Sequence, residues 1–279
     1  MTKAKPRLKP AHFFADHPIF TFDEFVESEP TRPIGTVKAL LRYHSKRGNL
    51  VRVRRGLYMR DDFFDPFLIA SRLAPDAIIA YDSALLLMRD PEPVLAGLER
   101  VSFLTASARI SRETFADIAF KPIAAPPVLG KRWRTSGVIC VERSGMQMSM
   151  TSPERTIVDV LDRIALAPPA TELWELLALG AFDPELMVAH ARALKSQIVF
   201  ARLGFLLEYL PTTPRKLLAT LERLAPKSPV YFDRPRQKGQ SAFINRWNLV
   251  ATMRLYQTVF RTDFRGRTPS LPKETELPD

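Results

Sequence analysis

The chain has 279 residues, 46% of them hydrophobic, and a formal net charge of +11. This length accommodates two domains with proper cores, and the basic balance indicates a polyanionic partner. No stretch approaches the roughly 18 apolar residues of a transmembrane helix, and no apolar segment follows the basic N-terminus as in a secretory signal. We therefore expect a cytoplasmic protein. The single cysteine, Cys140, excludes a disulfide framework, and its apolar neighbours predict a small buried strand residue.

The positive charge is concentrated at the N-terminus. Residues 1–60 hold 13 lysines and arginines against 5 acidic residues, whereas residues 61–279 hold 28 against 25. Residues 1–10 are basic and interrupted by prolines, which fits either a frayed tail or an arm that follows a DNA backbone. A membrane-binding helix is not expected, because the apolar stripe is modest and lacks a tryptophan anchor.

Two short helices are predicted in succession after residue 20. Thr21 precedes Glu24 by three residues, which is the spacing of a capping box at a helix start. A turn rich in proline and threonine follows at 30–33. The second helix is predicted over residues 34–46, and Gly48 with Asn49 ends it.

The second helix is predicted to have two contrasting faces. At about 100° per residue, its apolar side carries Val37, Leu40, Leu41 and His44. The opposite side carries small or cationic residues, namely Gly35, Lys38, Ala39, Arg42 and Lys46. The helix contains no acidic residue, although an ordinary surface helix mixes both signs of charge.

A basic hairpin is predicted after this helix. Residues 50–54 alternate apolar and cationic side chains, and a turn follows at Arg55 and Gly56. The alternation predicts that Arg52 and Arg54 both point away from the core. This order of elements is typical of a winged helix-turn-helix, whose helix enters the major groove while the wing follows a phosphate backbone. The alternative is a solvated basic face on an ordinary helical domain.

We predict that this module contacts DNA, with Lys38 and Arg42 at base edges and the wing arginines at phosphates. The predicted DNA-binding residues are Arg32, Gly35, Thr36, Lys38, Arg42, Lys46, Arg47, Arg52, Arg54 and Arg55.

A larger domain is predicted from residue 63, because the charge changes sign at Asp61 and Asp62 and the Asp65–Pro66 step is expected to stop a strand. Mixed strands are expected over 63–150, helices over 151–225, and strands with a loose tail over 226–279. The predicted class is α+β: an N-terminal winged helix-turn-helix on residues 1–62 and a larger mixed α/β domain with a helical segment on residues 63–279.

Several side chains of this larger domain carry specific expectations. Ser152 with Pro153 predicts a helix start, on which Arg155 and Asp159 are spaced to pair. Arg202 and Glu208 are expected to face solvent. The basic cluster at 131–134 fits either a nucleic-acid contact with stacking by its tryptophan or an exposed loop with a packed tryptophan. A second basic loop carries Arg234, Arg236 and Lys238.

No catalytic or metal motif is evident. The four histidines, at 12, 17, 44 and 190, lack zinc spacing. No acidic residue has a lysine two positions later, as a restriction-type nuclease site needs, and no glycine-rich phosphate loop occurs. A Ser/His/Asp set stays open on sequence order, although nothing singles one out. We expect no enzyme, no catalytic residue, no metal and no cofactor.

The ordered motifs resemble the AbiEi-like antitoxin family of bacterial type IV toxin–antitoxin systems over most of the chain. The segments that carry the resemblance are Gly48–Tyr58, Ser83–Leu85, Ser152–Asp159, Arg202–Glu208 and Arg246–Asn248. The chain departs from the family at Tyr81 and Asp82, where many relatives are expected to have a nearby histidine.

The resemblance implies a two-part abortive-infection antitoxin. Its winged helix would repress its own operon on double-stranded operator DNA. Its larger domain would counter a nucleotidyltransferase-like toxin without forming a stable complex. Two alternatives stay open. One is a winged-helix regulator with a ligand-sensing or dimerising C-terminal domain, and the other is a nuclease.

Overall fold

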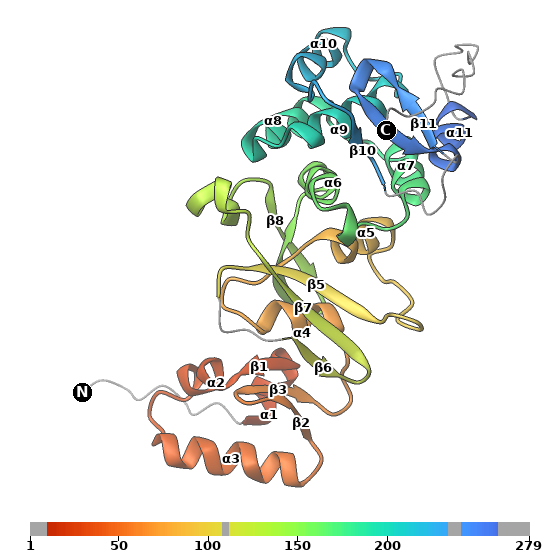
Figure 1. Ribbon diagram of the computed structural model, residues 1–279. Helices are drawn as coiled ribbons and strands as arrows, with labels where there is room; N and C mark the ends of the chain where they lie inside the picture. Colours follow the sequence, from red (N-terminus) through yellow and green to blue (C-terminus); the bar gives the residue numbers. More distant parts are fainter. Residues whose placement is uncertain (1–9, 108–111, 234–240, 262–279) are drawn as a thin grey trace. The chain divides into compact units, whose positions relative to one another are not determined.

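The structure is a computed structural model that describes residues 10–107, 112–233 and 241–261. The basic arm at 1–9, the loop with Arg234, Arg236 and Lys238, and the expected tail at 265–279 lie outside these residues. Helices and several sheets alternate along the chain, so the α+β class is confirmed (Figure 1). Within the described ranges, no helix combines the length and apolar character that a membrane crossing demands.

The chain divides into two compact units. The first comprises Met1–Ile79, Leu95–Ala124 and Ile139–Met150, and the second comprises Ala80–Val94, Ala125–Val138 and Thr151–Asp279. This division differs from the expected one after residue 62. The N-terminal segment shares a unit with the strands that follow it, because buried and half-buried polar contacts described below join them.

The N-terminal segment of the first unit contains three helices and a three-stranded antiparallel sheet with the strand order β1-β3-β2. Its elements are α1 (Pro10–Asp16), β1 (Ile19–Thr21), α2 (Phe22–Ser28), α3 (Ile34–Lys46), β2 (Leu50–Arg54) and β3 (Leu57–Arg60). The predicted helix over 34–46 and the hairpin are confirmed in their positions. The core that joins them is formed by Phe13, Phe14, Phe20, Phe25, Val37, Leu41 and Leu50.

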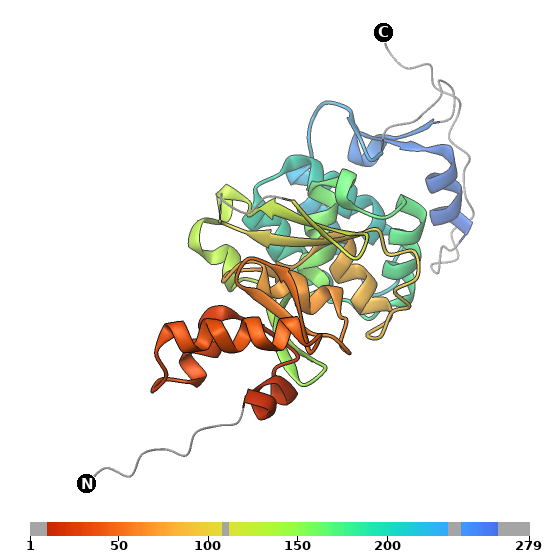
Figure 2. The same cartoon turned by 90° about the horizontal axis from the view of Figure 1, so that it is seen from below.

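Local signals explain where these helices begin. The Thr21 hydroxyl accepts from the Glu24 amide at 3.2 Å, and the Glu24 carboxylate accepts from the Thr21 amide at 2.6 Å. This reciprocal pair is the predicted capping box, and it starts α2. Val37 and Leu41 bury the apolar face of α3, and Lys38, Arg42 and Lys46 on its other face are exposed. Figure 2 draws the backbone of α3 at the near side of the N-terminal segment.

The rest of the first unit is a six-stranded sheet with the order β6-β7-β5-β4-β9-β8. Its elements are α4 (Pro66–Arg72), β4 (Ile78–Ile79), β5 (Arg100–Thr105), β6 (Glu113–Phe115), β7 (Ile118–Ala124), β8 (Val138–Arg143) and β9 (Met146–Thr151). Strands β5 and β7 pair in parallel, and helix α4 contacts β4, β5 and also β1. Helix α4 therefore links the two sheets of this unit.

No strand continues through the Asp65–Pro66 step, which starts α4. The buried Asp65 carboxylate accepts from the amides of Phe67 and Leu68, and Arg143 of β8 also donates to it. The expectation that Cys140 is buried is wrong. Cys140 is exposed, because β8 is an edge strand whose middle residues face solvent. An apolar neighbourhood in sequence therefore did not imply a buried strand.

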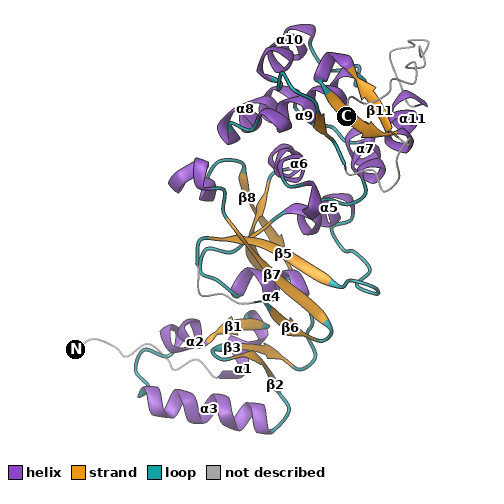
Figure 3. Cartoon of the chain, viewed as in Figure 1, coloured by secondary structure: helices purple, strands orange, loops and turns teal. Residues whose placement is uncertain are grey.

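The second unit is built mainly of helices (Figure 3). Its elements are α5 (Tyr81–Arg89), η1 (Pro127–Arg134), α6 (Pro153–Asp162), η2 (Ile164–Leu166), α7 (Ala170–Leu179), α8 (Pro184–Leu194), α9 (Gln197–Glu208), α10 (Arg215–Leu224), β10 (Val230–Tyr231), β11 (Ser241–Ile244), η3 (Asn245–Trp247), β12 (Leu249–Thr252) and α11 (Met253–Arg261). The Ser152 hydroxyl accepts from the Arg155 amide at 3.3 Å, which confirms the predicted start of α6.

Helix α9 is buried from Val199 to Glu208, so the expectation that Arg202 and Glu208 face solvent is wrong. The Arg202 guanidinium donates to the main-chain carbonyls of Leu161 and Tyr231. The Glu208 carboxylate accepts at 2.7 Å from both the Trp247 indole and the Arg246 guanidinium. Burial of these charges is tolerated because each group finds hydrogen-bond partners inside the unit.

Candidate nucleic-acid interface

Helix α3 presents its predicted polar face to solvent. Lys38, Arg42 and Lys46 are exposed, as are Gly35 and Thr36 in its first turn. Burial and the neighbouring Arg47 charge lower the pKa of His44 and so disfavour its charged form. The positive charge of the helix therefore comes from its exposed lysines and arginine, with no carboxylate on the same helix to offset it.

The hairpin places its arginines on different faces. Arg52 lies opposite Tyr58, but Arg54 lies opposite Leu57, because one extra residue in β2 forms a bulge between the two arginines. Residues directly opposite each other in an antiparallel pair point to the same face, and Leu57 is 1% exposed. Arg54 consequently points toward the interior of the unit, whereas Arg52 is exposed.

Arg54 is held by a specific partner. One of its terminal nitrogens donates to the main-chain carbonyl of Leu73, just past the end of α4. The prediction that Arg54 projects outward with Arg52 is therefore wrong. Alternation in the sequence could not reveal the bulge, because a bulge of one residue reverses which face the following side chains occupy.

Four cations of the N-terminal segment line one hollow of about 640 Å³. Lys38 and Arg42 come from α3, Arg52 from β2, and Arg55 from the hairpin turn. None of the described residues that line this hollow carries a carboxylate. Its remaining lining residues are Phe22, Ser45, Gly56 and Tyr58. The structure thus brings the predicted helix residues and the predicted wing residues to one concave, cationic surface, which we call the α3–wing hollow.

The other predicted contacts lie at the edges of this surface or are already paired. Arg32 forms an ion pair with the buried Glu29 at 2.9 Å, so its charge is largely neutralised. Arg47 is exposed and stacks over the Tyr43 ring, with its guanidinium carbon 4.9 Å from the ring centroid. Lys46 lies outside the lining of the hollow, near the C-terminal end of α3.

Sequence reasoning missed the aromatic part of the hollow. The Lys38 ammonium lies 6.0 Å from the centroid of the Phe22 ring. Tyr58 lines the hollow together with Arg52. The sequence carried no signal for either ring. Tyr58 lies opposite Arg52 only because of the bulge in β2, and Phe22 reaches the hollow from the preceding helix.

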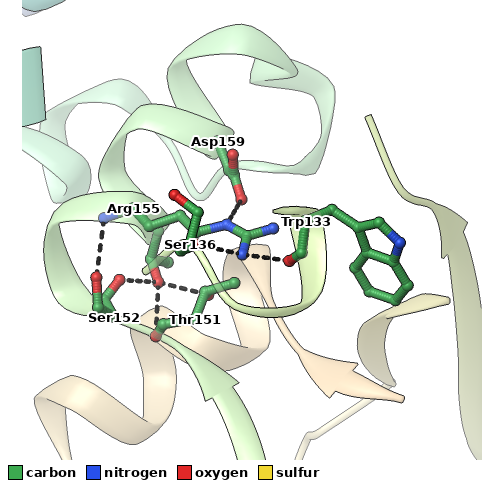
Figure 4. A network of polar contacts seen from close by, with 7 residues as sticks. Trp133, Ser136, Thr151, Ser152, Arg155 and Asp159 are labelled. Atoms are coloured by element: carbon green, nitrogen blue, oxygen red, sulfur yellow. Dashed lines mark hydrogen bonds and ion pairs between the residues drawn. The ribbon is translucent and has the colours of Figure 1, made fainter. Parts of the chain in front are cut away.

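The basic cluster at 131–134 belongs to the second unit. Trp133 is 6% exposed, so the interpretation with a packed tryptophan is correct and base stacking by this ring is not available. The guanidinium of Arg155 on α6 binds the main chain of the same segment (Figure 4). Its Nη1 donates to the carbonyls of Trp133 and Ser136, both at 2.7 Å, and its Nε donates to Asp159 at 3.2 Å, which confirms the predicted pair.

Arg155, Asp159 and the carbonyls of Trp133 and Ser136 form a buried polar cluster, which we call the Arg155 cluster. The pKa of its one carboxyl group is shifted. Arg155 and Asp159 are 2% and 3% exposed. Burial raises the pKa of Asp159 to about 6, against the opposing effect of the Arg155 charge. Gly137, next to Ser136 in the chain, has a positive φ, and a Cβ atom there would lie 2.6 Å from the His190 ring. Both facts favour glycine at this position. Among the described residues, no three His, Cys, Asp or Glu side chains are grouped to hold a metal ion.

Comparison with known proteins identifies a relative in fold. A crystal structure of the RV2827C protein from Mycobacterium tuberculosis superimposes with a TM-score of 0.55 at 16% identity, over 90% of this chain and 92% of that one. At this identity the likeness concerns the fold alone. No protein-family model matches the chain, and no curated protein matches it.

Proposed function

We propose that this protein is a DNA-binding transcriptional repressor and the antitoxin of a type IV toxin–antitoxin pair. In this proposal residues 10–62 form a winged helix-turn-helix that binds double-stranded operator DNA in the cytoplasm. The second unit opposes a nucleotidyltransferase-like toxin as a non-enzymatic partner. The observation that carries the DNA-binding part is the α3–wing hollow, in which four cations from three elements share one concave surface.

The dimensions and chemistry of α3 suit a major groove. Its 13 residues give a helix of about 20 Å, and its exposed face has no bulky apolar residue between Gly35 and Arg42. Lys38 and Arg42 are side chains that donate to guanine edges. Arg52 and Arg55 flank them on the wing, where they would meet phosphates and set affinity and register.

The antitoxin part depends on the family resemblance alone, and the contacts of two resembling segments describe how the second unit is packed. Two of the resembling segments, 202–208 and 246–248, meet in the interior of the second unit through the Glu208 carboxylate and the side chains of Arg246 and Trp247. A Cβ atom on Gly204 would lie 2.1 Å from the Trp247 ring, so glycine is required at this crossing. The resembling motifs therefore mark residues that hold the unit together.

The DNA-binding part is tested with a reporter gene under the control of the region upstream of this protein's own gene. The full chain should repress the reporter, and the Lys38→Ala/Arg42→Ala variant should lose most of that repression. Arg215→Ala/Lys216→Ala is the matched control, because it removes two exposed cations from α10, outside the hollow. Equal repression by the two double variants would refute the assignment of α3.

The antitoxin part is tested separately by co-expression with the neighbouring open reading frame. If that neighbour arrests growth, this protein should restore growth, and the Lys38→Ala/Arg42→Ala variant should do so equally well when expressed from an unrelated promoter. If the neighbouring gene product is toxic and this protein does not restore growth, the proposed antitoxin role is refuted, whereas the proposed repressor role is not affected.

A further inference from the structure

A second cationic hollow lies within the second unit, at the junction of α8 with α9 and beside the connection from α10 to β10. Its volume is about 810 Å³. Its lining residues are Arg192, Lys195, Gln197, Phe200, Arg223, Leu224, Ala225, Pro226, Lys227, Ser228 and Val230. We call it the α8–α10 hollow.

Among the described residues that line this hollow, four are cations and none carries a carboxylate. Arg192, Lys195, Arg223 and Lys227 are all exposed, and none has an ion pair or a side-chain hydrogen bond within the described part of the chain. The adjacent acid Glu222 is already engaged, since it pairs with Arg246 at 2.9 Å. Within the described ranges, the lining of the hollow therefore offers no counter-charge to these four cations.

The backbone that carries these cations is fixed in place. The Asn248 side chain donates to the Pro226 carbonyl at 3.0 Å, and the Asn248 carbonyl accepts from the Val230 amide at 2.9 Å. These contacts position Lys227 between them. On the other side Lys195 has a φ of 54°, the left-handed conformation that residues with a Cβ atom rarely adopt. A lysine thus occupies a position at which glycine would fit the backbone better.

Helix-end electrostatics account for only part of this arrangement. Arg192 and Arg223 lie in the last turns of α8 and α10, where a cation offsets the negative end of the helix dipole. That effect does not explain why Lys195 and Lys227, which lie beyond the helices, line the same hollow. Four cations that line one hollow suit a ligand that carries more than one negative group.

We propose that the α8–α10 hollow binds a ligand that carries two or more phosphate groups, supplied either by a nucleoside polyphosphate or by the backbone of a nucleic acid. Phe200 is the one aromatic side chain among the described lining residues, and it is only 5% exposed, so the hollow is expected to recognise the phosphates and not a stacked base. This site is distinct from the α3–wing hollow, and its occupancy does not depend on the proposed operator binding.

The test uses the full chain with Arg42→Ala and Arg52→Ala introduced, so that the N-terminal hollow contributes little to anion binding. Inorganic triphosphate is titrated into this background by calorimetry. Adding Lys195→Gly and Arg223→Ala should weaken binding at least tenfold. Lys195→Gly also suits the left-handed backbone, so loss of fold should not confuse the result. Adding Arg215→Ala and Lys216→Ala instead should leave the affinity within twofold.

Competition then distinguishes the two sources of phosphate. Displacement of triphosphate by ATP at lower concentration than by a short single-stranded RNA identifies a nucleotide ligand, and the reverse order identifies a nucleic-acid backbone. Either order supports the site. Absence of triphosphate binding, or equal weakening by the two pairs of added substitutions, would overturn it. Operator binding by chains with only the α8–α10 substitutions should stay unchanged, which separates this outcome from a failure of the proposed repressor function.

Discussion

Arg54 of the wing donates a hydrogen bond to the main-chain carbonyl of Leu73, beyond the end of α4. This contact joins the hairpin to the helix that supports the six-stranded sheet within the same unit. It also divides the wing arginines by role. Arg54 is a structural residue directed inward by the bulge in β2, whereas Arg52 remains on the cationic surface.

The first prediction separates these two arginines. Arg52→Ala should lower affinity for duplex DNA and reduce the log–log salt slope by about 0.9 if one phosphate contact is lost. Arg54→Ala should leave that slope nearly unchanged but lower the free energy of unfolding by about 1–3 kcal/mol, because the Leu73 carbonyl loses its partner. Salt titrations of binding and urea unfolding of both variants provide the measurements. A larger slope change in Arg54→Ala than in Arg52→Ala would contradict the assigned roles.

The second prediction concerns the crossing of α9 and η3. A Cβ atom on Gly204 would lie 2.1 Å from the Trp247 ring, so Gly204→Ala should destabilise the chain by at least about 1–3 kcal/mol through overpacking. Gly35→Ala is the matched control, because a Cβ atom there meets nothing within 4 Å. It should be neutral, or stabilising by up to about 1 kcal/mol. Equal unfolding midpoints for the two variants would show that the crossing is looser than described.

The third prediction is that the free energy of unfolding depends on pH through Asp159 of the Arg155 cluster. Burial raises the pKa of Asp159 to about 6, whereas an unfolded aspartate has a pKa of about 4. The Asp159 carboxyl therefore keeps its proton to a higher pH in the folded state than in the unfolded state. The contribution of this group to stability is present below about pH 4 and is lost as the pH rises through about 6. Its size is on the order of 3 kcal/mol.

Urea unfolding of the wild type and of Asp159→Asn between pH 4 and pH 7 measures this effect. The difference in unfolding free energy, wild type minus variant, should fall as the pH rises. Glu175→Gln, at an exposed position on α7, should show no such trend. A difference that increases with pH would mean that the Arg155 charge outweighs burial and lowers the pKa of Asp159.

Local signals in the sequence predicted local structure. The spacing of Thr21 and Glu24 located the start of α2, and Ser152 with Pro153 located the start of α6. Each signal works because all of its partners lie within one helical turn. The two faces of α3 were predictable for the same reason, since a regular helix fixes the direction of every side chain once its period is known.

Features set by distant partners could not be predicted. The burial of Glu208 depends on Trp247, and the partner of Arg54 lies 19 residues further along the chain. The exposure of Cys140 depends on the position of β8 at a sheet edge, which only the strand order reveals. In the candidate interface, the exposed side of α3 was predicted correctly, and the directions of the wing side chains were predicted correctly only up to the bulge.

The central claim is that α3 recognises DNA sequence while the wing supplies affinity. The most direct measurement is equilibrium binding of the full chain to a duplex from its own upstream region and to a scrambled duplex of the same length, followed by fluorescence anisotropy. Arg42→Ala should weaken binding to the upstream duplex by about 1–3 kcal/mol, with little change on the scrambled one. Arg55→Ala should weaken both alike. Equal losses on both duplexes in both variants, or no binding by the wild type, would contradict the account.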